Sequence, residues 1–164
     1  MKRLLLAFCL ALIGLFCMSQ EFNYYELENL INRDYNQGIY ICNVKGFRSV
    51  GQTYEGLSAP DSVISYYYEQ VNTTGNITGV IQLIFYKSDP DNVGGVHIFS
   101  KTPGTYADVI KEAQRLGMQK SDEQSNNDTI SGIYQDKNIY IYFSNNKSEA
   151  AKYSYVIYFE RKLD

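Results

Sequence analysis

Residues 34–47 read DYNQGIYICNVKGF, and residues 105–118 read TYADVIKEAQRLGM. The two stretches align without a gap, because a cap residue, an aromatic residue, a branched aliphatic residue, a small residue, a glycine and a large apolar residue recur at the same offsets. In the second stretch, five apolar or aromatic side chains follow helical spacing: Tyr106, Val109, Ile110, Ala113 and Leu116. Both stretches therefore predict an amphipathic helix that ends at a glycine, Gly46 or Gly117.

Polar residues predict how the helices begin. Thr105 is placed to cap the second helix, with Asp108 at the third helical position in a capping-box arrangement. A further short helix is predicted near residue 23, where Asn23 caps and Glu26 stands three residues on. This helix is expected to end near Arg33.

Strand-like segments follow each of the two matching helices. They are predicted at 63–71, 79–87 and 96–101 after the first helix, and at 129–135, 139–144 and 153–162 after the second. Residues 48–60 and 119–128 are polar and are expected to be connections. The pattern predicts an α+β fold, a tandem repeat of a helix followed by an antiparallel strand meander, with the helices on one face of the sheet. The repeats span 20–101 and 102–164, as one compact domain or as two units that share a sheet.

The predicted strands are rich in tyrosine, since the chain contains sixteen Tyr, eight Phe and no Trp. At 139–143 the aliphatic residues and Phe143 share one face, while Tyr140 and Tyr142 share the other. Helices should cover the aliphatic face and leave the tyrosine-rich face to solvent. Tyrosine is enriched at recognition surfaces. We therefore predict a binding face that contains five tyrosines: Tyr66, Tyr68, Tyr140, Tyr142 and Tyr158.

The first residues are typical of an export signal. Lys2 and Arg3 precede thirteen residues without a charge at 4–16, fewer than the about 20 that a helix needs to cross a bilayer. Cys17 and Ser19 lie three and one residues before a cut that would leave Gln20 first. Residues 1–19 are therefore predicted to be a cleaved signal peptide, and the product is expected in the periplasm or outside the cell.

Cys17 allows a second interpretation, because bacterial lipoproteins carry a lipidated cysteine after the apolar run. Phe16 fits that signal less well, since a small residue normally precedes the lipidated cysteine. The alternative is an outer-membrane lipoprotein with a structural or assembly role in the envelope. Contact with a membrane is expected only if Cys17 is lipidated.

Charge and reactive residues argue against several function classes. Removal of residues 1–19 takes away two bases and no acid, so the formal charge falls from −3 to −5. The sequence lacks the clustered Lys and Arg residues that are typical of nucleic-acid-binding proteins, so no nucleic-acid partner is expected. Cys42 is then the one cysteine left and is expected to be buried, and His97 has no second histidine with which to bind a metal. We predict no cofactor, metal or catalytic site. The leading prediction is a non-enzymatic binding module that recognises a protein or an envelope component. The envelope structural or assembly protein is the second possibility and an enzyme is the third.

The repeated unit at 34–47 and 105–118, each with its following strands, resembles the β-lactamase-inhibitor-like fold and small outer-membrane lipoproteins of the SmpA/OmlA kind. The resemblance spans most of the chain after residue 19 and implies protein binding through a sheet face or loops. The Gln20 start, the composition and the layout also resemble those of secreted Bacteroidetes proteins. That resemblance implies O-glycosylation of Asp-Ser/Thr-aliphatic triplets, here at Ser62 and Thr129, for which turn or cap chemistry is the alternative.

Overall fold

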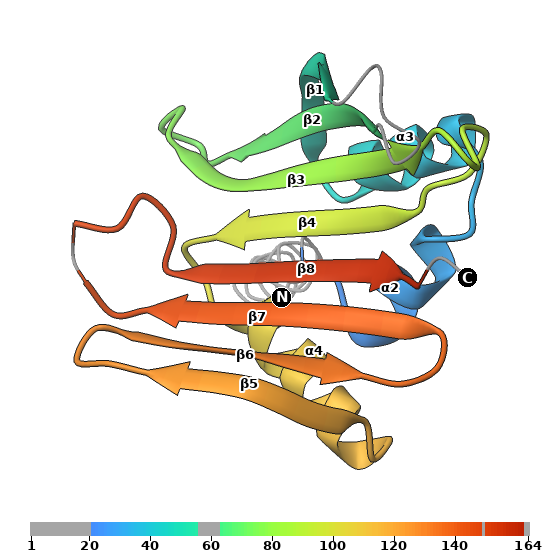
Figure 1. The fold of residues 1–164 in the computed structure, drawn as a ribbon. Helices are drawn as coiled ribbons and strands as arrows, with labels where there is room; N and C mark the ends of the chain where they lie inside the picture. Colours follow the sequence, from blue (N-terminus) through green and yellow to red (C-terminus); the bar gives the residue numbers. More distant parts are fainter. Residues whose placement is uncertain (1–20, 56–62, 149, 163–164) are drawn as a thin grey trace, which may run out of the picture.

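The computed structural model describes residues 21–55, 63–148 and 150–162. Within these ranges the chain forms three helices and an eight-stranded antiparallel sheet, so the predicted α+β class is confirmed and the sheet dominates the fold (Figure 1). The predicted signal peptide at 1–19, with Cys17, and the candidate acceptor Ser62 lie outside the described residues.

The elements alternate between one or two helices and four strands. The helices are α2 (Tyr24–Leu30), α3 (Tyr35–Val44) and α4 (Gly104–Arg115). The strands of the first half are β1 (Phe47–Glu55), β2 (Val63–Val71), β3 (Ile77–Tyr86) and β4 (Gly95–Ser100). Those of the second half are β5 (Gln119–Ser125), β6 (Thr129–Gln135), β7 (Ile139–Asn146) and β8 (Tyr155–Arg161). Their order across the sheet is β1-β2-β3-β4-β8-β7-β6-β5, so the two halves meet where β4 pairs with β8.

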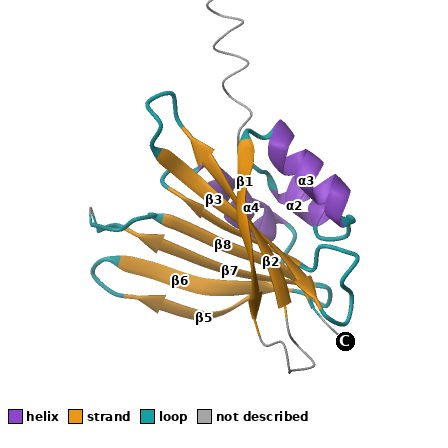
Figure 2. Cartoon of the chain, turned by 90° about the horizontal axis from the view of Figure 1, so that it is seen from above, coloured by secondary structure: helices purple, strands orange, loops and turns teal. Residues whose placement is uncertain are grey.

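The helices lie against one face of the sheet, as Figures 1 and 2 show. Each helix contacts residues of that face. The contacts are Tyr24 of α2 with Phe159, Gly38 of α3 with Leu83, and Tyr106 of α4 with Phe143. These sheet residues belong to one buried apolar cluster between the helices and the sheet, which forms the core.

The first two helices begin as the sequence predicts. Asn23 Oδ1 accepts a hydrogen bond from the Glu26 backbone N–H at 2.9 Å, and the Glu26 carboxylate accepts one from the Asn23 N–H at 3.0 Å. This is the predicted capping box. Asp34 caps α3 by accepting from the backbone N–H of Gln37 at 2.9 Å. Gly46 follows α3 with φ 80°, a left-handed conformation that glycine adopts without steric cost.

The start of α4 differs from its prediction. Pro103 is the N-cap residue and no side chain caps the helix, so the predicted capping box of Thr105 and Asp108 is wrong. Thr105 Oγ1 instead accepts a hydrogen bond from the Phe22 N–H at 2.9 Å, and Asp108 Oδ2 accepts one from the Tyr24 N–H at 2.8 Å. These partners lie 83 and 84 positions apart in the chain, so local spacing could not indicate them. The two side chains satisfy backbone donors at the start of α2.

Two strands lie where the sequence predicted polar connections. They are β1, which follows α3, and β5, which follows α4, and they form the two edges of the sheet. An edge strand is partly solvated and often carries polar or charged residues, so it lacks the alternation that reveals a buried strand. Each half therefore has four strands, of which the hydrophobic pattern indicated three.

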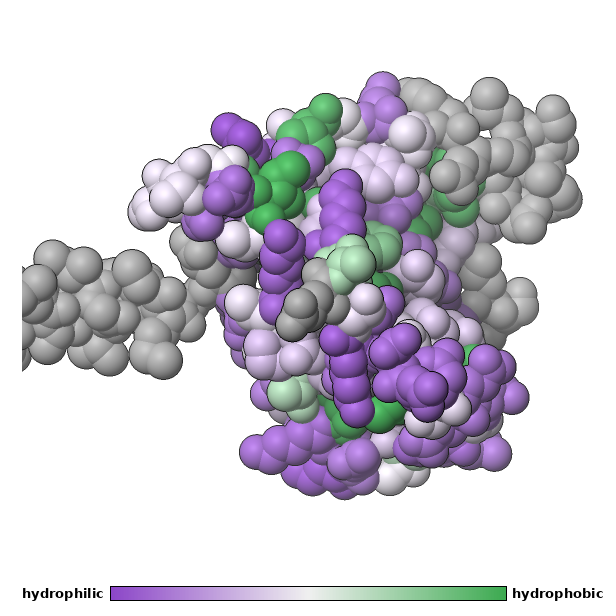
Figure 3. All heavy atoms as spheres, turned by 90° about the vertical axis from the view of Figure 1, so that its left-hand side faces the viewer, coloured by the Kyte–Doolittle hydropathy of each residue, from purple (hydrophilic) through white to green (hydrophobic). Residues whose placement is uncertain are grey.

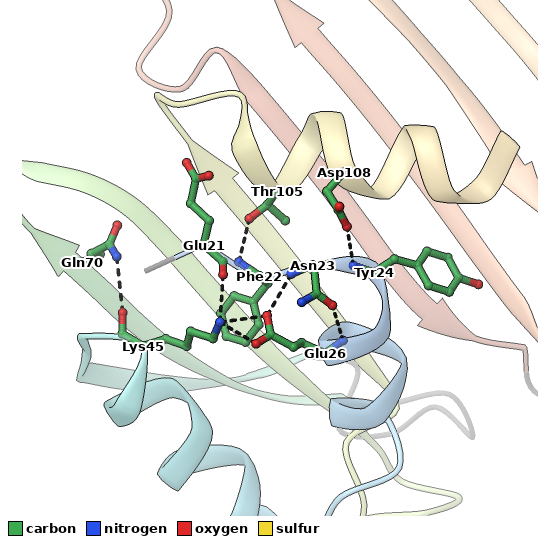
Figure 4. A network of polar contacts seen from close by, with 9 residues as sticks. All are labelled: Glu21, Phe22, Asn23, Tyr24, Glu26, Lys45, Gln70, Thr105 and Asp108. Atoms are coloured by element: carbon green, nitrogen blue, oxygen red, sulfur yellow. Dashed lines mark hydrogen bonds and ion pairs between the residues drawn. The ribbon is translucent and has the colours of Figure 1, made fainter. Parts of the chain in front are cut away.

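The start of α2 joins the two halves of the chain (Figure 4). On the side of the first half, Lys45 donates hydrogen bonds to the Glu21 carbonyl at 2.9 Å and to the Glu26 carboxylate at 2.7 and 2.8 Å. Its ammonium lies 5.4 Å from the Phe22 ring centroid, within the range of a cation–π contact. Since α4 holds the same segment from the other side, residues 21–26 contact both halves.

Lys45→Met is expected to lower the free energy of unfolding by about 1–2 kcal/mol, because it removes charge-assisted hydrogen bonds at a residue that is 8% exposed. Lys120→Met is the matched control. Lys120 also pairs with a carboxylate, Glu123 at 2.7 Å, and approaches an aromatic ring, Tyr134 at 5.9 Å. Its side chain is 37% exposed, so the change should stay below about 0.5 kcal/mol. If urea denaturation showed equal losses of unfolding free energy for the two variants, Lys45 would not hold the start of α2 as described.

Candidate binding face

The open face is the side of the sheet opposite the helices, on which His97, Phe99, Tyr142 and Tyr158 lie. Three of these rings form a row across adjacent strands. The ring centroids of Tyr142 and Tyr158 are 5.1 Å apart, and Tyr158 stacks on His97 at 4.0 Å. Tyr140 lies on the same face of β7, opposite Glu160. The structure thus brings together three of the predicted tyrosines, Tyr140, Tyr142 and Tyr158.

Tyr66 and Tyr68 lie on the other face, under the helices, so the predicted set of five is divided. Tyr68 is paired with Ile81 and Tyr66 with Leu83, two core residues of β3, and Tyr68 is only 1% exposed. Tyr67 is the tyrosine of this run on the open face. Three consecutive tyrosines show no alternation between polar and apolar residues, and a shift by one residue exchanges the faces. Their orientation therefore could not be determined from the sequence.

Glu160 links the row of rings to β3. Its Oε1 lies 2.5 Å from His97 Nε2, and its Oε2 accepts a hydrogen bond from the Tyr86 hydroxyl at 3.3 Å. Burial and the nearby Glu160 carboxylate raise the pKa of Tyr86 well above its usual value, so its phenol stays protonated and remains a donor. The side chains of His97 and Glu160 are only 16% and 26% exposed. This part of the open face is therefore held rigid by contacts within the chain.

A groove of about 540 Å³ lies beside the row of rings. Its lining joins four strands and the loop before β8: residues 50–53 of β1, Tyr67, Glu69, Val80, Phe99, Lys152 and Tyr153. The Phe99 ring lies 5.9 Å from Tyr153 on one side and 5.9 Å from Tyr158 on the other. The groove is therefore continuous with the row of rings.

The lining of the groove is suited to an apolar or aromatic group. Tyr67, Phe99 and Tyr153 present half-buried rings, and the charged groups of the lining are one carboxylate, Glu69, and one ammonium, Lys152. Aromatic rings supply contact area, while a few polar groups fix the orientation of what binds. Phe99 alternates with the core residues of β4. This alternation is the sequence signal that could have placed Phe99 on the open face. The sequence places Tyr153 at the start of the predicted strand at 153–162, whereas β8 begins at Tyr155 and Tyr153 lies in the loop before it.

Reactive groups are scarce in the described part of the chain. Across residues 21–55, 63–148 and 150–162, no three His, Cys, Asp or Glu side chains gather as metal ligands would. Cys42 is fully buried, and burial raises the pKa of its thiol to about 12. The thiol therefore stays protonated near neutral pH, whereas a nucleophilic cysteine acts as the thiolate.

Comparisons of the chain with protein-family models, with curated proteins and with solved structures found no match. None of the helices in the described ranges is both long and apolar enough to span a membrane.

Proposed function

We propose that the protein is an exported, non-enzymatic binding module that recognises another protein through the open face. The groove beside the row of rings is the observation that carries this proposal. Its volume of about 540 Å³ falls within the roughly 300–1,000 Å³ of typical ligand pockets. Tyrosine and phenylalanine bury a large area at a small cost in conformational entropy, which suits them to recognition. The firm contacts around Glu160 support the same use, because a preorganised surface loses little freedom on binding.

We also propose that the two halves are tandem repeats, at 20–101 and 102–164, that share one sheet. The element order supports this, since a helix followed by four neighbouring strands occurs twice. Gly46 and Gly117 add support, because both adopt a left-handed conformation, with φ of 80° and 70°, just after the helix of their half. This layout agrees with the resemblance to the β-lactamase-inhibitor-like fold, which implies protein binding through a sheet face or loops.

Export remains part of the proposal. Cleavage after Ser19 would leave Glu21, Phe22 and Asn23 in place, so the contacts that hold the start of α2 would survive it. Mass spectrometry of the mature N-terminus tests this step. A diacylglycerol adduct on Cys17 would replace the secreted form by the envelope lipoprotein.

Phe99→Ser should abolish partner capture from extracellular and envelope fractions. Tyr25→Ser is the matched control, because Tyr25 is an aromatic residue of α2 with 52% of its surface exposed, away from the open face. With a captured and purified partner, we expect Phe99→Ser to weaken the Kd by about 30-fold, which corresponds to a hot-spot loss of about 2 kcal/mol. A double variant, Tyr140→Ser with Tyr142→Ser, separates the row of rings from the groove. Unchanged affinity in both open-face variants would show that the partner binds elsewhere.

A further inference from the structure

The groove on the open face contains one acidic and one basic side chain, on either side of an apolar floor. Glu69 of β2 lies opposite Val80 of β3, and Val80 lies opposite Phe99 of β4. Directly opposed residues of an antiparallel sheet point to the same side, so these three side chains share the open face. Lys152 and Tyr153 come from the loop before β8, which lies on the far side of β4 from β2. The order across the strands is therefore acid, apolar floor, base.

This part of the groove lies toward the end of the sheet at which β2 and β4 end and β3 begins, on the left in Figure 1. Figure 3 views the molecule from that end and shows hydrophobic residues at the surface between hydrophilic ones. Apolar contact area and charge are thus both present at this end of the molecule.

The two charges of the groove have no ion-pair partner among the described residues, neither Glu69 nor Lys152. The Lys152 ammonium lies 5.4 Å from the ring centroid of Tyr153, within the range of a cation–π contact. Arg48 of β1 lies opposite Glu69 in the register, but within the described ranges it forms no ion pair with that carboxylate and does not line the groove. Both charges are therefore available to a ligand.

The carboxylate of Glu160, on the same face, is in a different situation. It contacts His97 and accepts a hydrogen bond from the Tyr86 hydroxyl, so its charge is already engaged within the chain. Glu69 and Lys152 are thus the charged groups through which the open face can select a partner at the groove. Complementary charges contribute specificity more than affinity, whereas the aromatic floor supplies contact area.

The spacing of the strands indicates how long a segment the groove holds. Adjacent strands lie about 4.8 Å apart, so the backbones of Glu69 and Phe99, two strands apart, are separated by about 10 Å. An extended peptide rises about 3.3 Å per residue and turns every second side chain to the same side. Positions i, i+2 and i+4 of such a segment therefore cover about 13 Å. With the length of two charged side chains added, three alternate residues reach from Glu69 to Lys152.

We infer that the groove recognises an extended segment of the partner protein in which a basic, an apolar or aromatic, and an acidic residue occupy alternate positions. The base faces Glu69, the central side chain packs on Phe99 between Tyr67 and Tyr153, and the acid faces Lys152. The segment crosses the strands of the sheet, and its chain direction decides whether the base or the acid comes first in its sequence. This inference rests on the proposed function, because it names the chemistry of the partner at the same groove.

Selection of random heptapeptides displayed on phage against the immobilised protein tests the inference. We expect the enriched peptides to share an apolar or aromatic residue, with a base two positions to one side and an acid two positions to the other. Selection on Glu69→Lys should replace the base by an acid, and selection on Lys152→Glu should replace the acid by a base. Glu123→Lys on β5 and Lys111→Glu on α4 are matched controls at exposed positions outside the groove and should return the wild-type consensus.

A rescue experiment shows that the variants are folded and that the charges act directly. Fluorescence polarisation with a labelled consensus peptide should give a Kd that Glu69→Lys or Lys152→Glu weakens about tenfold, since an exposed attraction becomes a repulsion. A peptide with its base changed to an acid should bind Glu69→Lys about as tightly as the original peptide binds the wild type. A consensus without the two charges, or one that neither Glu69→Lys nor Lys152→Glu alters, overturns the inference.

Phe99→Ser distinguishes a failure of this inference from a failure of the proposed function. If Phe99→Ser loses the enriched peptides but these peptides lack the paired charges, the groove is the binding site and only the inferred charge pattern is wrong. If the enriched peptides bind Phe99→Ser as tightly as the wild type, or if no peptide is enriched, the groove does not recognise a peptide segment. That result overturns the inference and removes the groove from the proposed function as well.

Discussion

Phe159→Ala is expected to lower the free energy of unfolding by about 3–5 kcal/mol, the usual cost of truncating a buried phenylalanine. Phe159 is fully buried at the centre of the sheet, opposite Val96 of β4 and Ile141 of β7. Its ring meets the Tyr24 ring of α2 edge to face at 5.2 Å. The substitution therefore opens a cavity where the two halves and α2 come together. Since a domain of this size is stabilised by about 5–15 kcal/mol, this loss would be a large fraction of the total.

Tyr158→Ala is the control for Phe159→Ala, because it removes a ring from the next residue of the same strand on the opposite face. Its ring contacts His97, Phe99 and Tyr142 on the open face, and we expect a loss of unfolding free energy of no more than about 1.5 kcal/mol. Urea denaturation of both variants, followed by circular dichroism, gives the two free energies. If Phe159→Ala and Tyr158→Ala lost equal free energies of unfolding, the open face would be packed as tightly as the core. That result would remove the basis for a binding surface there.

Thr105→Val combined with Asp108→Ala should lower the free energy of unfolding by about 2–4 kcal/mol, because each substitution leaves a backbone N–H at the start of α2 without its acceptor. Thr105 is only 5% exposed, and valine keeps its shape while removing the hydroxyl. The amide protons of Phe22 and Tyr24 are the donors concerned. Hydrogen exchange at these two amides should therefore accelerate more than exchange in the central strands.

Thr102→Val is the matched control for this pair. The Thr102 hydroxyl donates to the Glu21 carboxylate at 2.6 Å, a hydrogen bond between the same two parts of the chain but at an exposed position. Its loss should change the free energy of unfolding by less than about 0.5 kcal/mol, because water replaces the missing partner. If the Phe22 and Tyr24 amides stay protected in the Thr105→Val, Asp108→Ala double variant, then α4 does not hold the start of α2.

Local chemistry explains which parts of the fold could be predicted from the sequence. Asn23 and Asp34 cap their helices through bonds to residues three positions on, so sequence spacing alone indicated them. The alternation at Ile139 and Ile141 likewise indicated a strand with one buried face. Thr105 has the same local surroundings as a cap, but its partner comes from the start of α2. That contact depends on the tertiary fold, which local spacing does not describe.

The candidate site could be predicted only in strands where tyrosine and aliphatic residues alternate clearly between the two faces. Tyr140 and Tyr142 alternate with aliphatic residues, and the structure places both on the open face. The groove could not be predicted, because its lining joins the β1 bulge at Val50 with Phe99 and the loop at Tyr153. The edge strand has no hydrophobic period, and Tyr153 lies outside the strand in which its alternation would place it. The approach of these segments depends on the full order of strands.

The central pairing of β4 with β8 has a consequence for how the protein folds. Ile98 of β4 lies opposite Ile157 of β8, although 59 residues separate them in the chain. Each meander can form from sequential hairpins, whereas this contact must wait until the last strand is available. During synthesis, β4 therefore presents an apolar, unpaired edge until nearly the whole chain has emerged. A chain truncated before β8 should fold slowly or aggregate, since this edge would have no partner to close it.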